Sequence, residues 1–171
     1  MPTMRRASLV LALTLVLGGC MSDNGANDPL PRMSRAHAEA WAEDWVDSMA
    51  RTAKSEIISD TLSANFHNCT GKNGETAHDG RFTLMFNARA KVPRAQYAEA
   101  LKALRSELEA QGFKVVGYQE GPGQERGAYG LQASRPKDKQ FVSAGDVGDD
   151  LWTLSVDTPC LLPPDAKQQQ F

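Results

Sequence analysis

The segment RFTLMFNARAKV, residues 81–92, has the clearest secondary-structure pattern in the chain. Apolar and polar side chains alternate along nearly all of it, from Arg81 and Phe82 to Lys91 and Val92, and Met85 is the one apolar residue in the polar set. A period of two places the apolar side chains on one face of a β-strand and the polar ones on the other. The segment therefore predicts a strand in a sheet that has one buried face and one face in contact with water.

An amphipathic helix is expected before this strand, from Ser34 to about Ile58. Ser34 is a favourable N-cap residue, because its hydroxyl can accept a hydrogen bond from a backbone N–H of the first turn. Apolar residues then recur at steps of three and four, which places them on one side of a helix. They are Ala38, Trp41, Ala42, Trp45, Met49, Ala53 and Ile57.

A second helix is expected after the strand, beginning at Pro93, because proline is well tolerated at the first helical position. Gly112 can adopt the left-handed conformation that ends many helices, and Phe113 is placed to fold back onto Leu108. The apolar side of this helix is formed by Tyr97, Leu101, Leu104 and Leu108.

The rest of the chain predicts short strands near 113–119, 129–134, 139–144 and 151–157, with turns at 121–123 and 145–150 and a polar loop over 65–80. A helix, a strand, a second helix and then several strands is the order of an α+β domain. We expect a mostly antiparallel sheet of four to five strands, with two helices packed on one face. This single domain is expected to span residues 34–163 and to be followed by a disordered tail over 164–171.

Length and charge limit the functional classes. The chain has 171 residues, which suits one domain. It has 19 basic and 21 acidic residues, for a net charge of −2. Nucleic-acid-binding proteins usually carry a strong basic excess, so this balance argues against that class of partner.

The first twenty residues have the three-part pattern of a secretory signal. Arg5 and Arg6 form a positive start, and residues 7–17 are apolar apart from Ser8 and Thr14. This apolar part is short for a membrane span, which needs about 20 residues. Small residues follow it, as they do at the cleavage site of such a signal.

The sequence Leu17-Gly18-Gly19-Cys20 resembles the lipobox of bacterial lipoproteins. The resemblance implies that a diacylglycerol is attached to the sulfur of Cys20 and that residues 1–19 are removed as a signal peptide. Residues 20–33 then form a flexible linker, because they are rich in Asp, Asn, Gly and Pro. The lipid would hold the protein at the extracytoplasmic side of the cell membrane.

Two other interpretations of this segment stay open. Residues 9–17 would form a buried helix of the domain with Cys20 as a core thiol, or an ordinary signal peptide would be cut at another position.

Two cysteines remain for the mature domain, Cys69 and Cys160. Outside the reducing cytosol, an even pair favours a disulfide, here across 91 residues. We expect Cys69 to precede the first strand and Cys160 to follow the last, so that the bridge joins both ends of the domain. The alternative is a cysteine nucleophile assisted by His67.

Motifs for catalysis or metal binding are not found. His37, His67 and His78 do not form a ligand pair at helical or strand spacing, and the chain has no phosphate loop or nucleophile elbow. We therefore expect a protein that is not an enzyme and that has no cofactor and no metal site. A metal site in the polar loop, at His67 and His78 with neighbouring carboxylates, is the alternative.

The candidate ligand platform consists of Trp41 and Trp45, one helical turn apart, together with His67 and His78. Core packing is the alternative role for the two tryptophans. The sequence favours a non-catalytic lipoprotein that binds an envelope protein or a small ligand, through the uncovered sheet face or the polar loop over 67–80. An accessory or sensory subunit of a membrane complex and a small hydrolase without motifs are the alternatives.

Overall fold

A computed structural model describes residues 28–121 and 127–171. The signal peptide, Cys20 and most of the linker therefore lie outside the described residues. The elements are α1 (Arg35–Thr52), β1 (Glu56–Asn68), β2 (Phe82–Lys91), a 3₁₀ turn (Arg94–Gln96), α2 (Tyr97–Ala110), β3 (Lys114–Glu120), β4 (Tyr129–Arg135), β5 (Gln140–Gly148) and β6 (Leu151–Asp157).

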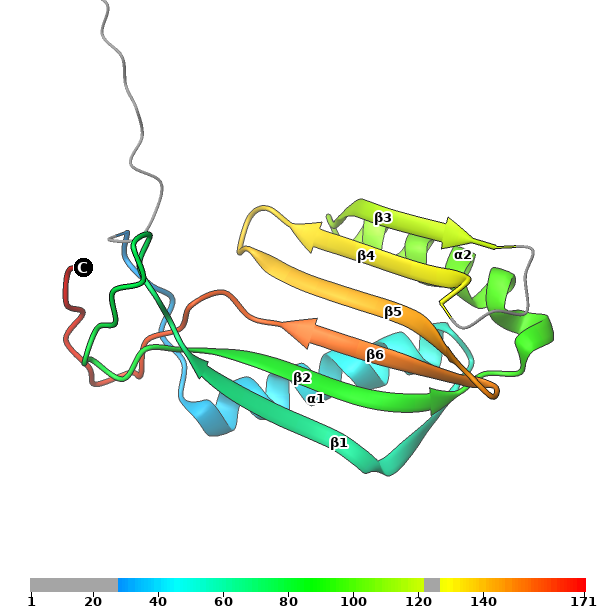
Figure 1. The fold of residues 1–171 in the computed structure, drawn as a ribbon, viewed down its shortest axis with the longest axis horizontal. Coiled ribbons are helices and arrows are strands. Elements are labelled where there is room, and N and C mark those ends of the chain that lie inside the picture. The colour runs from blue at the N-terminus through cyan, green and yellow to red at the C-terminus, as the bar shows by residue number, and fades with distance from the viewer. Residues whose placement is uncertain (1–27, 122–126) are drawn as a thin grey trace, which may run out of the picture.

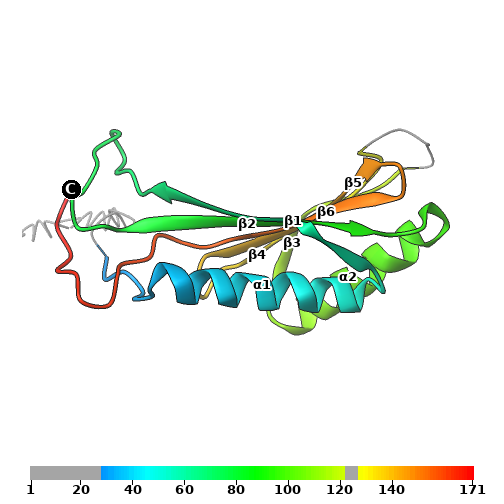
Figure 2. The same ribbon diagram turned by 90° about the horizontal axis from the view of Figure 1, so that it is seen from below.

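The described strands form one antiparallel sheet in the order β1-β2-β6-β5-β4-β3 (Figure 1). Both helices lie on the same face of this sheet, and the other face is left open (Figure 2). The predicted α+β class with two helices on one face is confirmed. Within the described residues the sheet has six strands, where four to five were expected.

The additional strand is β1. Its residues were expected to belong to the end of the first helix and to a polar loop. The helix ends at Thr52, and Lys54 has a positive φ of 52° that turns the chain back toward the sheet. Ile57 therefore pairs with Ala90 in the sheet and does not continue the helical stripe. The pairing of β1 with β2 shifts between Ile58 and Ser63, and such a bulge interrupts the alternation by which a strand is recognised.

The second difference concerns the turn expected at 145–150. β5 continues to Gly148, and the turn consists of Asp149 and Asp150, with φ of 54° and 56°. Two successive residues with positive φ are typical of the tight type I′ hairpin turn, which accepts aspartate. The acidic residues predicted to lie in a loop thus make a two-residue hairpin.

The core lies between the sheet and the helices. The predicted alternation of β2 is confirmed, since its apolar side chains from Phe82 to Ala90 are buried at every second position. Most of the buried residues of α1 are alanines, and most of those of α2 are leucines. The buried residues are Ala38, Ala42, Val46, Met49 and Ala50 on α1, and Tyr97, Ala100, Leu101, Leu104 and Leu108 on α2.

The end of α2 has the predicted geometry. Gly112 has a φ of 84°, and its N–H donates to the carbonyl of Glu109 at 3.1 Å. The N–H of Phe113 donates to the carbonyl of Leu108 at 2.9 Å. This pair of hydrogen bonds is the Schellman motif, which requires a left-handed residue at the position of Gly112.

Candidate binding surfaces

Trp41 and Trp45 lie side by side on α1, with ring centroids 6.3 Å apart in an edge-on arrangement. Both are half-buried, because the buried stripe of α1 runs beside them through Ala38 and Ala42. Trp45 packs on Phe113 at 5.4 Å, and the guanidinium of Arg135 lies 5.4 Å from the Trp45 ring. The two tryptophans thus pack against the core and stay partly exposed, and their role as a ligand platform stays a prediction.

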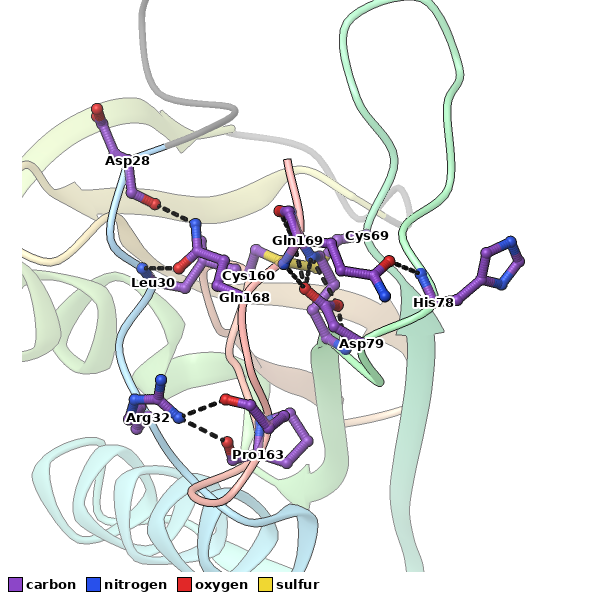
Figure 3. A network of polar contacts seen from close by, with 12 residues as sticks. Asp28, Leu30, Arg32, Cys69, His78, Asp79, Cys160, Pro163, Gln168 and Gln169 are labelled. Atoms are coloured by element: carbon purple, nitrogen blue, oxygen red, sulfur yellow. Dashed lines mark hydrogen bonds and ion pairs between the residues drawn. A yellow bond between two sulfur atoms is a disulfide. The ribbon is translucent and has the colours of Figure 1, made fainter. Parts of the chain in front are cut away.

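The two histidines of the candidate platform lie elsewhere. His67 is exposed on β1 and pairs with Thr83, so its side chain belongs to the open face of the sheet. His78 is exposed in the following loop, and its ring points away from the neighbouring residues (Figure 3). The sheet separates His67 from the tryptophans, and the four residues do not form one site.

The disulfide end of the domain comprises Cys69, Cys160 and the segments 70–80 and 163–171. The two sulfur atoms lie at bonding distance, 2.05 Å (Figure 3). Cys69 follows β1 and precedes β2, so the bridge joins the end of the first hairpin strand to the chain after β6. This placement differs from the expectation that Cys69 precedes the first strand, because β1 was not anticipated.

The C-terminal segment, expected to be a disordered tail, makes specific contacts at this end (Figure 3). The side chain of Gln168 accepts from the N–H of Leu30 at 3.0 Å and donates to the carbonyl of Asp28 at 2.8 Å. The N–H of Gln169 donates to the carboxylate of Asp79 at 2.9 Å. The polar composition of this segment predicted disorder. In the structure, amide side chains form hydrogen bonds with backbone groups and hold the segment in place.

The start of the described chain is held in the same way, although it was assigned to the flexible linker. The N–H of Met33 donates to the carbonyl of Leu162 at 3.0 Å, and that of Leu162 donates to the carbonyl of Pro31 at 2.9 Å. Arg32 donates to the carbonyls of Pro164 and Ala166 at 2.7 and 2.8 Å. The two ends of the domain are therefore fastened to each other.

A buried ion pair lies at the centre of the disulfide end. Asp79 and Arg81 have side chains that are each 1% exposed, and Nε of Arg81 donates to both carboxylate oxygens at 2.9 and 3.0 Å. Arg81 also donates to the carbonyl of Gln169. Hydrogen bonds from Arg81 hold the pKa of the Asp79 carboxyl well below its usual range. All of these contacts are internal to the domain, which indicates a structural role.

The open face carries a shallow trough of about 450 Å³ across β3, β4, β5 and β6. Strand register shows how it is built. One row of paired residues crosses the strands through Gln119, Gly130, Gly145 and Thr153, and the next row through Gly117, Gln132, Ser143 and Ser155. We call these eight residues the open-face trough.

Glycines give the trough its depth. Gly130 and Gly145 are direct cross-strand partners, and a Cβ built on either residue would have no heavy atom closer than 3.9 Å. The floor is therefore backbone that a ligand can approach closely. Two glycines in strand positions are the signal by which the sequence alone could have indicated this surface.

The remaining outward side chains of the trough are neutral and able to form hydrogen bonds. Ser155 donates to Asn87 at 2.7 Å, and the amides and hydroxyls of Gln119, Gln132, Ser143 and Thr153 face solvent on the same side. Asp146 borders the trough only through its backbone, because its side chain is on the helix side and fully buried. This chemistry suits recognition of an uncharged polar ligand by hydrogen bonds.

In residues 28–121 and 127–171, no group of three or more His, Cys, Asp and Glu side chains is arranged to hold a metal ion. No helix in this part of the chain is both long and apolar enough to cross a membrane.

Known proteins do not identify the domain. No protein-family model matches the chain, and neither a curated protein nor a solved structure matches it.

Proposed function

We propose that the protein is a non-catalytic binding module of the bacterial cell envelope, tethered by a lipid on Cys20. In this proposal, the open-face trough binds an uncharged ligand through hydrogen bonds. The observation that carries it is the trough, where neutral amides and hydroxyls surround a floor of bare backbone at Gly130 and Gly145. The resemblance of residues 17–20 to a lipobox supports the tether.

The position of the chain start supports an outward-facing trough. Eight peptide units separate Cys20 from Asp28, and they span at most about 29 Å when fully extended. Asp28 is fastened to Gln168 at the disulfide end. A lipid on Cys20 would therefore hold this end closest to the membrane.

The trough lies toward the opposite end of the sheet. Gly145 and Thr153 are near the β5–β6 hairpin turn, whereas Cys160 follows the other end of β6 (Figure 1). A tether at the disulfide end would leave the trough accessible from the side away from the membrane.

The side chains of the trough favour binding over catalysis. General acid–base or nucleophilic catalysis needs titratable groups that converge on the substrate. The outward side chains of the described trough residues are amides and hydroxyls, and His37, His67 and His78 are exposed at other positions.

Gly145→Thr tests the role of the trough. Threonine is a good strand residue, and a Cβ at this position would meet its nearest heavy atom, the carbonyl oxygen of Tyr129, at 3.9 Å, which is an ordinary contact distance. The fold should be retained while the trough is filled.

The readout is photo-cross-linking in the producing bacterium, with a photoreactive amino acid at Gln132 in the trough or at exposed Ser106 on α2 as the control. We expect an adduct of defined mass from Gln132 and none from Ser106, and we expect Gly145→Thr to abolish it. Equal labelling at both positions, or labelling that Gly145→Thr leaves unchanged, would contradict the proposed binding surface. A stoichiometric membrane protein in the adduct would identify an accessory subunit.

The tether has its own test. Mass spectrometry of the membrane-extracted protein should find a peptide that begins at Cys20 and carries a diacylglyceryl group. A chain that retains residues 1–19 and a free thiol at Cys20 would contradict the lipoprotein assignment.

A further inference from the structure

A second cavity, of about 170 Å³, lies beside α1 on the helix side of the molecule. It is partly open to solvent and lies between the chain segments before α1 and after β6, and most of its wall is apolar. The apolar wall is formed by Pro31, Met33, Trp41, Pro159 and Leu161. Gln140, at the start of β5, also lines it, and we call this cavity the Gln140 pocket.

Gln140 has a buried donor without a partner. The residue is 1% exposed, and its Oε1 accepts from Arg135 at 2.6 Å, which fixes the orientation of the amide. Among the described residues, Nε2 of Gln140 has no hydrogen-bond partner. Leaving a buried donor unsatisfied is unfavourable, so an occupant whose acceptor oxygen reaches Nε2 would be stabilised in the pocket.

The volume of the pocket limits the size of that occupant. An apolar cavity of about 150 Å³ accommodates benzene, whereas sites for whole small-molecule ligands usually measure about 300–1,000 Å³. The Gln140 pocket is therefore suited to a single apolar side chain. A side chain of this kind belongs to a longer chain that continues outside the pocket.

The surroundings of the pocket have the composition of a protein–protein contact. Trp41 also borders a neighbouring hollow of about 280 Å³ along α1, together with Trp45 and Asp44. Arg135 lines the Gln140 pocket and lies over the Trp45 ring at 5.4 Å. Tryptophan and arginine are enriched among the residues that dominate binding at protein interfaces.

The charge beside the Gln140 pocket indicates which kind of residue would be next to the apolar one in the occupant. Asp44 is exposed and forms no ion pair within residues 28–121 and 127–171. A basic residue next to the apolar one would complement this carboxylate.

We propose that the Gln140 pocket is an anchor site for an extended segment of a protein partner. One apolar side chain of that segment fills the pocket, Nε2 of Gln140 donates to its backbone carbonyl, and a neighbouring basic residue lies near Asp44. This site is on the opposite side of the sheet from the open-face trough, and it does not depend on the function proposed for the trough.

The test uses two blocked dipeptides as probes, N-acetyl-Leu-Lys-amide and N-acetyl-Gly-Lys-amide, with the full chain in a mild non-ionic detergent. We expect the leucine probe to bind saturably and to shift the side-chain amide resonances of Gln140 in ¹⁵N-resolved NMR spectra. Tryptophan fluorescence should change with the same affinity, because Trp41 forms part of the wall. The glycine probe lacks the side chain that fills the pocket, and it should bind at least about tenfold more weakly.

The matched protein variant is Gln140→Glu, which keeps an acceptor for Arg135 and removes the donor. It should weaken binding of the leucine probe about tenfold, the size expected for loss of one hydrogen bond. Gly145→Thr should leave this binding unchanged, which separates the Gln140 pocket from the trough. Equal affinity for both probes, or Gln140 amide resonances that do not move, would overturn the proposal. Both outcomes are measured on the wild-type protein, so they do not depend on whether a variant folds.

Discussion

Asp79→Asn should destabilise the domain strongly, because it removes one charge of a buried pair and leaves the other. In the wild-type protein, the Asp79 carboxylate accepts from Arg81 and from the N–H of Gln169. An asparagine retains one acceptor oxygen and turns an NH₂ group toward groups that are themselves donors. The guanidinium of Arg81 would then be buried without a counter-charge.

The size of the effect follows from burial. Both side chains are 1% exposed, and breaking a buried ion pair from one side typically costs about 3–5 kcal/mol. For a chain of this length, each kcal/mol lowers the melting temperature by roughly 2–4 °C, which gives a decrease of roughly 6–20 °C.

Urea unfolding of the full chain with the disulfide intact measures this loss. Glu109→Gln is the matched control, because Glu109 accepts from Arg105 at 2.9 Å on the exposed side of α2. Exposed pairs of this kind contribute about 0.2–1 kcal/mol. The double variant Asp79→Leu/Arg81→Met removes both charges and should recover most of the loss, since apolar replacement of a buried pair is often close to neutral.

The pH dependence gives a second measure of the same interaction. The folded-state pKa of Asp79 is depressed, so its contribution is fully present above the unfolded pKa of about 3.9 and is lost as the pH falls below that value. The stability difference between wild type and Asp79→Asn should therefore be constant from pH 7 to about 5 and decrease toward pH 2. A loss below about 1 kcal/mol at pH 7, or a difference that does not change on acidification, would refute this account.

Three further predictions concern the disulfide, the end of α2 and a tyrosine. Replacing Cys69 and Cys160 by alanine should lower the free energy of unfolding by up to about 4–5 kcal/mol, the loop-entropy value for a bridge across 91 residues, and an unchanged urea midpoint would contradict this. Gly112→Ala should cost about 1–2 kcal/mol in urea unfolding, because alanine is strained at a φ of 84°, whereas a neutral effect would show that the helix end rearranges. Burial, and secondly the hydrogen bond to Glu120, raise the pKa of Tyr118 to about 12, so spectrophotometric titration should show a tyrosine that ionises about two pH units late. Glu120→Gln should lower that pKa toward its ordinary value, and the stability that Tyr118 contributes should be lost as the pH rises from about 10 to 12.

The spacing of apolar residues was sufficient to predict an element where that element is buried on one face along its whole length. β2 alternates with one exception, the exposed Met85, because it lies inside the sheet, between β1 and β6, and every second side chain contacts the helix layer. The Schellman ending of α2 was predictable for a similar reason, since its hydrogen bonds join residues within one helical turn. Both features depend only on neighbours in the sequence.

β1 could not be recognised in this way. It is an edge strand with a bulge, and only a few of its side chains, such as Ile57 and Phe66, reach the core. Without a continuous buried face there is no alternation to detect. The contacts of the C-terminal segment could not be predicted for another reason. Gln168 and Gln169 form hydrogen bonds with Asp28, His78 and Asp79, which lie far away in the sequence.

The two candidate binding surfaces also could not be predicted from patterns within one segment. Gly130, Gly145 and Thr153 form one row of the trough only because three strands pair in a particular register. The Gln140 pocket brings together the chain before α1, the helix itself and the chain after β6. Periodicity along one segment carries no information about which other segment it will contact.

From the residues alone one could thus predict a sheet with one buried face, two amphipathic helices that cover this face, and a pair of cysteines for a disulfide. These properties follow from the spacing of apolar residues and from residue counts. The pairing of β2 with β6, the order of the described strands, and the positions of the trough and the Gln140 pocket emerge only in the folded protein. Those features depend on contacts between residues that are distant in the chain, and their free energy comes from the packing of whole elements.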